Sequence, residues 1–368
     1  MRVLIVGGGI IGCATAEALA RASAEVILYE RGAPGGEASG AAAGLLTAFG
    51  GGPRTQFQDL AIASWRLYPT VAADLRERTG IDVELVRRGT LYPLLDAGEI
   101  AEMTVPEPLA TEFGAQILDE EQVRRQEPAL SPKVRGALFV AGDHWVNSQR
   151  LVTAYAQAAA LAGVEMRTGR SVARILVADG RARGVVAEGE EVTGDAVLIA
   201  AGAWSGELVA SFGAALPVGP ARGQMVALSH VPPVLMHCVH ADDVYLVPRP
   251  SGELLVGATV EHVGFRREVT ARGVGELIAA AVDIVPALGD RAIARTWYGF
   301  RPWAPDGLPI LGPWPGVSGL FVATAHFRSG IMLAPITARL MAQWILEGVP
   351  SIAVTDFLPD RYVAAGRG

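Results

Sequence analysis

The sequence is poor in cysteine. Only two of its 368 residues, Cys13 and Cys238, are cysteines, and they lie far apart in the chain. Neither belongs to a CxxC pair or a zinc-type spacing, so we expect no disulfide framework and no cysteine-bound metal. His237 and His240 flank Cys238, but no carboxylate pattern completes a set of metal ligands. This cysteine usage fits a reducing cytoplasm.

Basic charge and long apolar runs are also scarce. The formal net charge is −7 and no basic cluster offsets it, which argues against nucleic acid or an anionic membrane as a partner. The charge-free stretch at 307–327 is broken by prolines and glycines, so it cannot form a spanning helix. The apolar start, with Ala-Ser-Ala at 22–24, superficially resembles a secretion signal. Its glycines suit a tight turn better, and we expect a cytoplasmic protein.

Glycine and apolar residues are abundant instead. Hydrophobic residues make up 51% of the chain and charged residues 19%, which is typical of a folded globular protein. The length predicts about two domains. The 44 glycines suggest tight turns and places where the backbone approaches a ligand closely.

The order of predicted elements indicates a mixed α/β fold. Strands at 2–6 and 25–30 enclose a helix at 11–21, which makes a βαβ unit. Asp179-Gly180 and Ser251-Gly252 predict hairpin turns. Further helices are predicted at 60–79, 148–162, 271–285 and 330–348. Further strands are predicted within 81–95 and at 171–177, 183–187, 196–201, 222–228, 243–248, 253–260, 293–300 and 319–324. Because βαβ-like pieces alternate with antiparallel hairpins, we expect two interleaved domains.

A nucleotide fingerprint follows the first strand. Residues 7–12 fit GxGxxG: Gly7 permits the turn, Gly9 lets the backbone approach a pyrophosphate, and Gly12 lets helix and sheet pack closely. Glu30 ends the second strand, 18 residues beyond Gly12, where a carboxylate can accept both ribose hydroxyls. A glycine turn without a ligand is the alternative. The spacing predicts a dinucleotide site but does not separate NAD from FAD.

A small-residue loop at 35–47 comes soon after Glu30. It can lie flat along an extended dinucleotide, whereas a flexible linker would be more polar. Four other distinctive stretches follow along the chain. They are Thr-Gly-Ile-Asp-Val at 79–83 with Gly-Thr-Leu at 89–91, Tyr-Leu-Val-Pro-Arg at 245–249 with Gly-Ala-Thr at 257–259, the segment 299–312, and His-Phe-Arg-Ser-Gly-Ile at 326–331.

With these stretches, the chain resembles the D-amino acid oxidase-type FAD-dependent oxidoreductases, and most of all their glycine oxidase branch. The resemblance implies a Rossmann-like FAD-binding domain (1–85, 146–220 and 296–368) interleaved with an antiparallel-sheet substrate-binding domain (86–145 and 221–295). It also implies oxidation of glycine or a similar amine to the imine, with molecular oxygen reduced to hydrogen peroxide. Since 31–60 holds no histidine or cysteine, we expect the FAD to be noncovalent.

The resemblance also implies site residues. Arg301 matches an arginine that binds the substrate carboxylate, a task that suits its planar fork. Tyr245 matches a tyrosine whose hydroxyl also contacts that carboxylate. Arg328 matches an arginine near the flavin and the substrate amine. The alternatives are a surface ion pair for Arg301, a strand aromatic for Tyr245 and a surface or capping role for Arg328. The residues matched to cofactor binding are Gly7, Gly9, Ile10, Ile11, Gly12, Glu30, Arg31, Ser39, Ala43, Gly44, Leu45, Val172, Gly202, Trp204, Gly330 and Ile331.

Several points stay open at this stage. Hydride transfer from an oriented amine needs no side-chain base, so we assign no catalytic residue, and His326 is not taken as one. The glycine-rich stretch 49–52 departs from the family and leaves the size of the substrate open. Alternatives are oxidation of an N-methylated or larger D-amino acid, a dehydrogenase with another electron acceptor, and an NAD-dependent or merely binding Rossmann protein. By analogy we expect a homotetramer and a role in thiamine biosynthesis.

Overall fold

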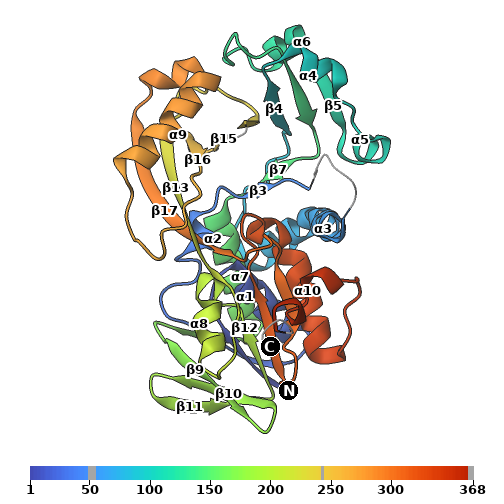
Figure 1. The fold of residues 1–368 in the computed structure, drawn as a ribbon, viewed down its shortest axis with the longest axis vertical. Helices are drawn as coiled ribbons and strands as arrows, with labels where there is room; N and C mark the ends of the chain where they lie inside the picture. Colours follow the sequence, from blue (N-terminus) through green and yellow to red (C-terminus); the bar gives the residue numbers. More distant parts are fainter. Residues whose placement is uncertain (49–54, 242–243, 364–368) are drawn as a thin grey trace.

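The computed structural model describes residues 1–48, 55–241 and 244–363. Figure 1 shows two lobes, with both chain ends in the lower one. A six-stranded sheet forms the centre of the lower lobe and an eight-stranded sheet forms the upper lobe. The predicted mixed α/β class is confirmed, as is the interleaving, because the chain passes repeatedly between the sheets.

The six-stranded sheet has the order β18-β19-β12-β1-β2-β8. Five strands are parallel: β1 (Arg2–Val6), β2 (Glu25–Glu30), β8 (Glu165–Thr168), β12 (Ala196–Ile199) and β19 (Leu320–Thr324). β18 (Ile310–Pro313) runs antiparallel. The central strands are almost wholly buried because both faces of the sheet are covered.

Alternate residues of β1 enter different cores. Val3 and Ile5 pack with α1 (Ile10–Arg21), α7 (Ser148–Leu161) and α10 (Gly330–Glu347). Leu4 and Val6 pack on the other face with the small sheet β9 (Val172–Ala178), β10 (Arg181–Ala187) and β11 (Glu190–Thr193). The turn between β9 and β10 has positive φ at Asp179 and Gly180, as the hairpin signal predicts.

The eight-stranded sheet has the order β17-β13-β16-β15-β14-β4-β6-β5 and is mostly antiparallel. Its longest pair, β13 (Gly219–Ser229) and β17 (Ile293–Trp303), runs from the lower lobe into the upper one (Figure 1). α9 (Ala271–Ile284) packs against it through Leu277 and Ala281. The remaining strands are β4 (Thr90–Leu94), β5 (Ala115–Asp119), β6 (Gly136–Val140), β14 (Cys238–Ala241), β15 (Val244–Pro248) and β16 (Glu253–Gly257).

Some elements differ from their sequence predictions. Six strands longer than two residues were not predicted: β5, β6, β8, β11, β14 and β18. The segments of β8, β11 and β14 are short and polar or carry histidine, and those of β5, β6 and β18 are short and lie in proline-containing stretches. The strands predicted within 81–95 reduce to β4, since Glu84 has positive φ and Val86 makes only an isolated bridge to Trp145. α3 (Gln56–Thr79) starts four residues earlier than 60, at a capping box in which Thr55 and Gln58 exchange hydrogen bonds.

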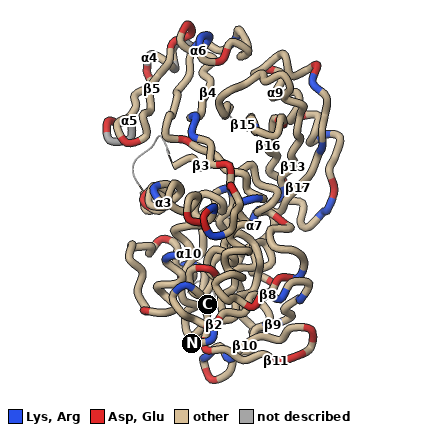
Figure 2. The backbone as a smooth tube through the Cα atoms, turned by 180° about the vertical axis from the view of Figure 1, so that it is seen from behind, with Lys and Arg blue, Asp and Glu red and all other residues tan. Residues whose placement is uncertain are grey.

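Short elements complete the described chain: α2 (Ala38–Ala41), β3 (Leu45–Leu46), α4 (Ala97–Glu102), α5 (Glu107–Phe113), α6 (Glu120–Gln126), β7 (His144–Trp145), α8 (Ser205–Ala210), α11 (Asp360–Val363) and the 3₁₀ turns Gly202–Trp204, Pro286–Asp290 and Thr355–Phe357. Basic and acidic residues are interspersed over both lobes in Figure 2. No helix among the described residues is long and apolar enough to cross a membrane.

Candidate active site

A long cavity of about 1080 Å³ runs between the two lobes. It is larger than the roughly 300–1,000 Å³ typical of sites for one small ligand. It starts where the parallel strands of the lower sheet end, which is the usual ligand position in such sheets. Every sequence-predicted site residue except Gly12 lines it: Gly7, Gly9, Ile10, Ile11, Glu30, Arg31, Ser39, Ala43, Gly44, Leu45, Val172, Gly202, Trp204, Tyr245, Arg301, Arg328, Gly330 and Ile331.

Gly12 does not line the cavity, and its role is in packing: its neighbours leave no room for a side chain. A Cβ on Gly12 would come within 1.9 Å of the Gly7 carbonyl oxygen. Gly7 itself has φ +114°, and a Cβ there would meet the Ala200 carbonyl oxygen at 2.4 Å. The fingerprint thus brings the turn, α1 and β12 into contact at the backbone level, as GxGxxG predicts.

Glu30 and Ser39 fix the fingerprint end of the cavity, which we define by Gly7, Gly9, Glu30, Ser39 and Gly202. The Glu30 carboxylate accepts the backbone N–H of Gly8 at 2.8 Å and that of Gly32 at 2.7 Å. Each of its oxygens keeps a lone pair for a ligand hydroxyl. The Ser39 hydroxyl accepts the Ile10 N–H at 3.0 Å, which ties the small-residue loop to the start of α1.

An aromatic and ionic clasp closes the rim of this end. We define the clasp as Arg31, Glu37, Trp204, Phe265 and Arg267. The Arg31 guanidinium lies 3.7 Å from the centre of the Trp204 ring, and Phe265 stacks on the same ring at 4.5 Å. Glu37 pairs with Arg31 at 2.9 Å and with Arg267 at 2.7 Å. Phe265 and Arg267 belong to the connection 258–270 between β16 and α9, so the clasp joins the two lobes.

Arg249 supports the loop that holds Ala43 and Gly44. Its buried guanidinium donates to the carbonyl oxygens of Val146, at 2.8 Å, and of Ala43. Burial lowers the pKa of Arg249 to about 10. The sequence motif at 245–249 contains this arginine, but the motif did not reveal its supporting role.

The N-terminus of α10 faces the middle of the cavity. Gly330 and Ile331 line it, and the helix end offers unpaired amide groups and partial positive charge there. α3 holds this end in place: Ser64 donates to the Met332 carbonyl oxygen at 2.6 Å, and Tyr68 donates to that of Ile331. The α10 start is therefore anchored by side chains of a separate helix.

Tyr245, Arg301 and Arg328 come together at the other end, which we call the arginine end. Tyr245 lies on β15 and Arg301 on β17, while Arg328 is exposed at the cavity mouth. Burial raises the pKa of Tyr245, and the two nearby guanidinium groups oppose that rise. Partial desolvation at the cavity mouth lowers the pKa of Arg328, and the charge of Arg301 lowers it further. This end is cationic, which suits a carboxylate.

Gly223 explains how Arg301 reaches the cavity. Ala221 of β13 is opposite Arg301 of β17, so Gly223 lies two residues further along the same face. A Cβ on Gly223 would come within 2.3 Å of Arg301 Nη1. The guanidinium thus lies directly on the β13 backbone. No sequence motif marks Gly223, because its role depends on a strand far along the chain.

The remaining candidate groups are buried or paired. His326 lines the cavity and contacts the Thr337 hydroxyl at 3.2 Å, and burial lowers its pKa to about 3. Burial raises the pKa of both Cys13 and Cys238 to about 12, so both thiols are unreactive. His237 pairs with Glu127 at 2.7 Å. No three metal-ligating side chains gather within the described ranges. The stretch 49–52, which bears on substrate size, lies outside them.

Comparisons with known proteins agree with this geometry. The chain is 34% identical to the glycine oxidase of Pseudomonas aeruginosa, over 100% of this chain and 99% of that protein. It is 37% identical to the hydrogen cyanide synthase subunit HcnC of the same species, over 83% of this chain and 74% of that protein. The crystal structure of glycine oxidase from Geobacillus kaustophilus superposes with a TM-score of 0.90 at 34% identity, covering 98% of this chain and 99% of that one. The family model for FAD dependent oxidoreductases matches residues 2–344, and the protein belongs to that FAD-using family.

Proposed function

We propose that the protein is an amino-acid oxidase whose substrate is glycine or a similarly small amine, such as sarcosine or a small D-amino acid. The product is the imine, which water converts to the 2-oxo acid, and molecular oxygen is reduced to hydrogen peroxide. The observation that carries this proposal is the arginine end: the Arg301 fork lies on Gly223, beside the Tyr245 hydroxyl, and both line one cavity with the α10 N-terminus. The relatives named glycine oxidase support the same choice.

The residues of the long cavity fit FAD. Glu30, Ser39 and the fingerprint would hold the adenosine and pyrophosphate, with Arg31, Val172, Gly202 and Trp204 along the same side. The α10 N-terminus would stabilise negative charge on the flavin. When bound, FAD supplies the two-electron acceptor for the reaction. Neither buried cysteine lines the cavity, but His240 and His326 do. Acid precipitation tests the expected noncovalent binding, because it should release the flavin into the supernatant.

The side chains of the arginine end bind and orient the substrate. Arg301 offers two parallel N–H donors to a carboxylate. The raised pKa of Tyr245 keeps its hydroxyl protonated. The hydroxyl donates to Met225 Sδ at 3.3 Å, and it would turn to the substrate carboxylate, which is a stronger acceptor than the sulfur. A substrate pinned in this way presents its α-hydrogen in one direction. The charge of Arg328 near the amine favours the neutral amine, which is the form that can be oxidised.

We also propose that the lobes divide these tasks. The segments 1–85, 146–220 and 296–368 would bind FAD, and 86–145 and 221–295 would bind the substrate. All strands of the six-stranded sheet fall in the first set, and most strands of the eight-stranded sheet fall in the second. β13 and β17 cross the proposed boundaries, since each of them serves both lobes.

A second candidate function is a dehydrogenase of the same fold that passes electrons to an acceptor other than oxygen. One relative, at 37% identity, is named as a subunit of hydrogen cyanide synthase and not as an oxidase, so membership of the family does not by itself fix the electron acceptor. Such an enzyme would share the arginine end, because the carboxylate must be held in either case. Only the reoxidation step separates the two candidates.

The deciding experiment mixes the purified holoenzyme anaerobically with glycine, sarcosine and D-alanine in turn and follows the visible flavin absorption band. We expect bleaching by at least glycine or sarcosine, then recovery with release of peroxide when air is admitted. Bleaching that recovers only with an artificial electron carrier would favour the dehydrogenase. A flavoprotein that none of the three amines bleaches would contradict the proposed substrate class.

A further inference from the structure

The Arg301 guanidinium is held from the side by a backbone carbonyl. Arg301 Nη1 donates to the Thr259 carbonyl oxygen at 2.9 Å, and Gly223 lies under the same nitrogen. One edge of the planar fork therefore binds the protein backbone, and the fork also lies beside the Tyr245 hydroxyl. The direction in which the fork points depends on where Thr259 is held.

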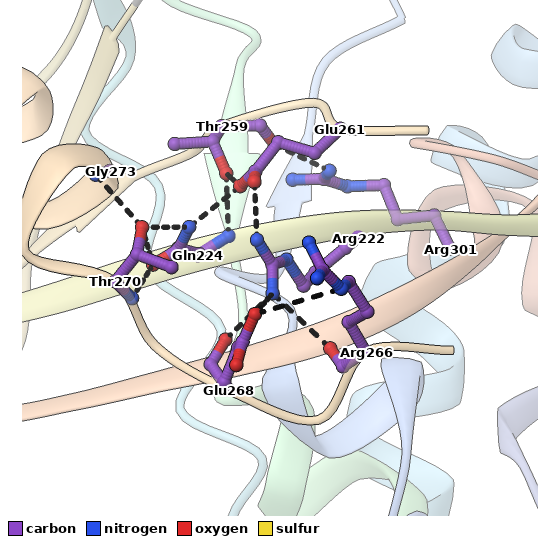
Figure 3. Close-up of polar contacts among 9 residues, drawn as sticks. All are labelled: Arg222, Gln224, Thr259, Glu261, Arg266, Glu268, Thr270, Gly273 and Arg301. Carbon is purple, nitrogen blue, oxygen red and sulfur yellow. Dashed lines mark hydrogen bonds and ion pairs between the residues drawn. The ribbon is translucent and has the colours of Figure 1, made fainter. Parts of the chain in front are cut away.

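Thr259 is held by its own hydroxyl. The hydroxyl donates to Glu261 Oε1 at 2.6 Å and accepts the Gln224 backbone N–H at 2.9 Å. Figure 3 shows these contacts between the connection 258–270 and β13, next to Arg301. Thr259 lies two residues beyond the end of β16, where only a few backbone hydrogen bonds still pair the segment with β13: Thr259 N–H to the Gln224 carbonyl oxygen at 3.3 Å and a bridge between Glu261 and Arg222. The side-chain contacts reinforce this short pairing.

Glu261 is the residue on which the contacts converge. Its Oε1 also accepts the Gln224 side-chain amide at 2.8 Å, and its Oε2 pairs with Arg222 Nη2 at 2.5 Å. Burial would raise the pKa of Glu261, but hydrogen bonds from Arg222, Thr259 and Gln224 outweigh burial and lower it. The carboxylate is therefore ionised and accepts from three donors.

The partners of Glu261 are themselves fixed. The Arg222 side chain is 3% exposed, and Gln224 is fully buried. Gln224 Oε1 accepts the Thr270 N–H at 2.7 Å, and Thr270 caps α9 (Figure 3). Glu268 also reaches Arg222, at 3.6 Å, but from the solvent side, and it does not touch Thr259.

From these contacts we propose that Glu261 is a positioning residue for the substrate carboxylate. It holds the Thr259 hydroxyl, which places the Thr259 carbonyl, and that carbonyl turns the Arg301 fork toward the cavity. The inference rests on the proposed function, in which Arg301 binds a carboxylate. It adds a residue to the site that does not itself touch the substrate.

The test compares Glu261→Gln with the matched control Glu268→Gln. Whichever way the new amide at 261 is oriented, its NH₂ group faces a donor, either Arg222 or the Thr259 and Gln224 pair. In the holoenzyme, titration with acetate followed by flavin absorbance should show binding weakened about tenfold by Glu261→Gln, the size of one hydrogen bond to a charged group. The KM for glycine should rise more than kcat falls. Glu268→Gln should stay within about twofold of the wild type, as is usual for exposed charges.

A second pair of variants keeps the test decisive if Glu261→Gln does not fold. Thr259→Val removes only the hydroxyl and keeps the carbonyl that contacts Arg301. It should weaken acetate binding like Glu261→Gln, and Thr259→Ser should recover most of the loss. Equal acetate affinity in the wild type and Glu261→Gln, or in Thr259→Val and Thr259→Ser, would overturn the inference and leave the proposed function standing. A wild-type holoenzyme that neither binds acetate nor oxidises glycine would overturn both.

Discussion

The two ends of the cavity are built by different means. The fingerprint end is made largely of backbone amide groups, glycines and small side chains. Most of them come from residues 7–39, with Glu30 18 residues after Gly12, and Gly202 is the one distant member of the set defined above. The arginine end is made of side chains from β13, β15, β17 and the 258–270 connection, held to one another by a polar network. The fingerprint end has no room for larger side chains at its close-packed glycines. The arginine end depends instead on the direction of individual side chains.

Replacement of Arg301 should show most clearly that the two ends have different tasks, because it should impair substrate binding and leave FAD binding unchanged. We expect Arg301→Ala to lower kcat/KM for glycine about a thousandfold, because two hydrogen bonds to a charged group are lost. FAD content should be unchanged. Arg295→Ala is the control: Arg295 lies on the same strand but pairs with Glu253 at the surface. A variant that loses FAD yet binds glycine normally as holoenzyme would place Arg301 at the wrong end.

Gly12→Ala should damage the fingerprint end instead. The new Cβ would collide with the Gly7 carbonyl and push α1 away from the turn. Overpacking of this kind should weaken FAD binding about a hundredfold. Gly275→Ala provides the control, because Gly275 lies in α9 with nothing within 4 Å. Equilibrium titration of the apoprotein with FAD measures both. Unchanged FAD affinity in Gly12→Ala would show that the close contact does not limit the site.

Arg267→Ala tests the clasp, where the two lobes meet. Removing its pair with Glu37 and its contacts with the aromatic rings should speed FAD release about fivefold. The rise of free FAD fluorescence after dilution gives the rate. Arg266→Ala is the matched neighbour, since Arg266 is 69% exposed and pairs only with Glu268 at 4.0 Å. The difference between the variants should shrink at high salt, and equal release rates would contradict a role for the clasp.

Asp143 should make the stability of the upper lobe depend on pH. Burial raises its pKa from 3.8 to about 7, although the Tyr92 hydroxyl donates to it at 2.7 Å. The folded protein therefore keeps a proton that the unfolded chain loses between these values, so stability falls as pH rises through this window. Between pH 5 and 8 the melting temperature of the wild type should fall about 2–4 °C further than that of Asp143→Asn. Asp283→Asn, at an exposed carboxylate, should follow the wild type.

The sequence predicted the fingerprint end well because its chemistry is local. Gly7, Glu30 and Ser39 lie within one βαβ unit and its following loop, and all of them line the cavity. Tyr245, Arg301 and Arg328 could be placed only by resemblance, since nothing in their spacing brings them together. Gly223 and the roles of Arg249 and Glu261 were not predicted. Each contacts residues far along the chain: Gly223 contacts Arg301, Arg249 contacts Ala43 and Val146, and Glu261 contacts Arg222 and Gln224. Contacts of that kind follow from the tertiary structure, which short motifs do not encode.

In the proposed arrangement, FAD would link the two lobes at the clasp. Phe265 and Arg267 extend from the upper lobe, and Arg31, Glu37 and Trp204 extend from the lower one and line the cavity. Separating the lobes would open this rim, so cofactor release and lobe separation are thermodynamically coupled. A ligand that binds only the closed arrangement stabilises it in proportion to the logarithm of its free concentration. In that arrangement, the supply of FAD would also affect the stability of the enzyme, in addition to its ability to react.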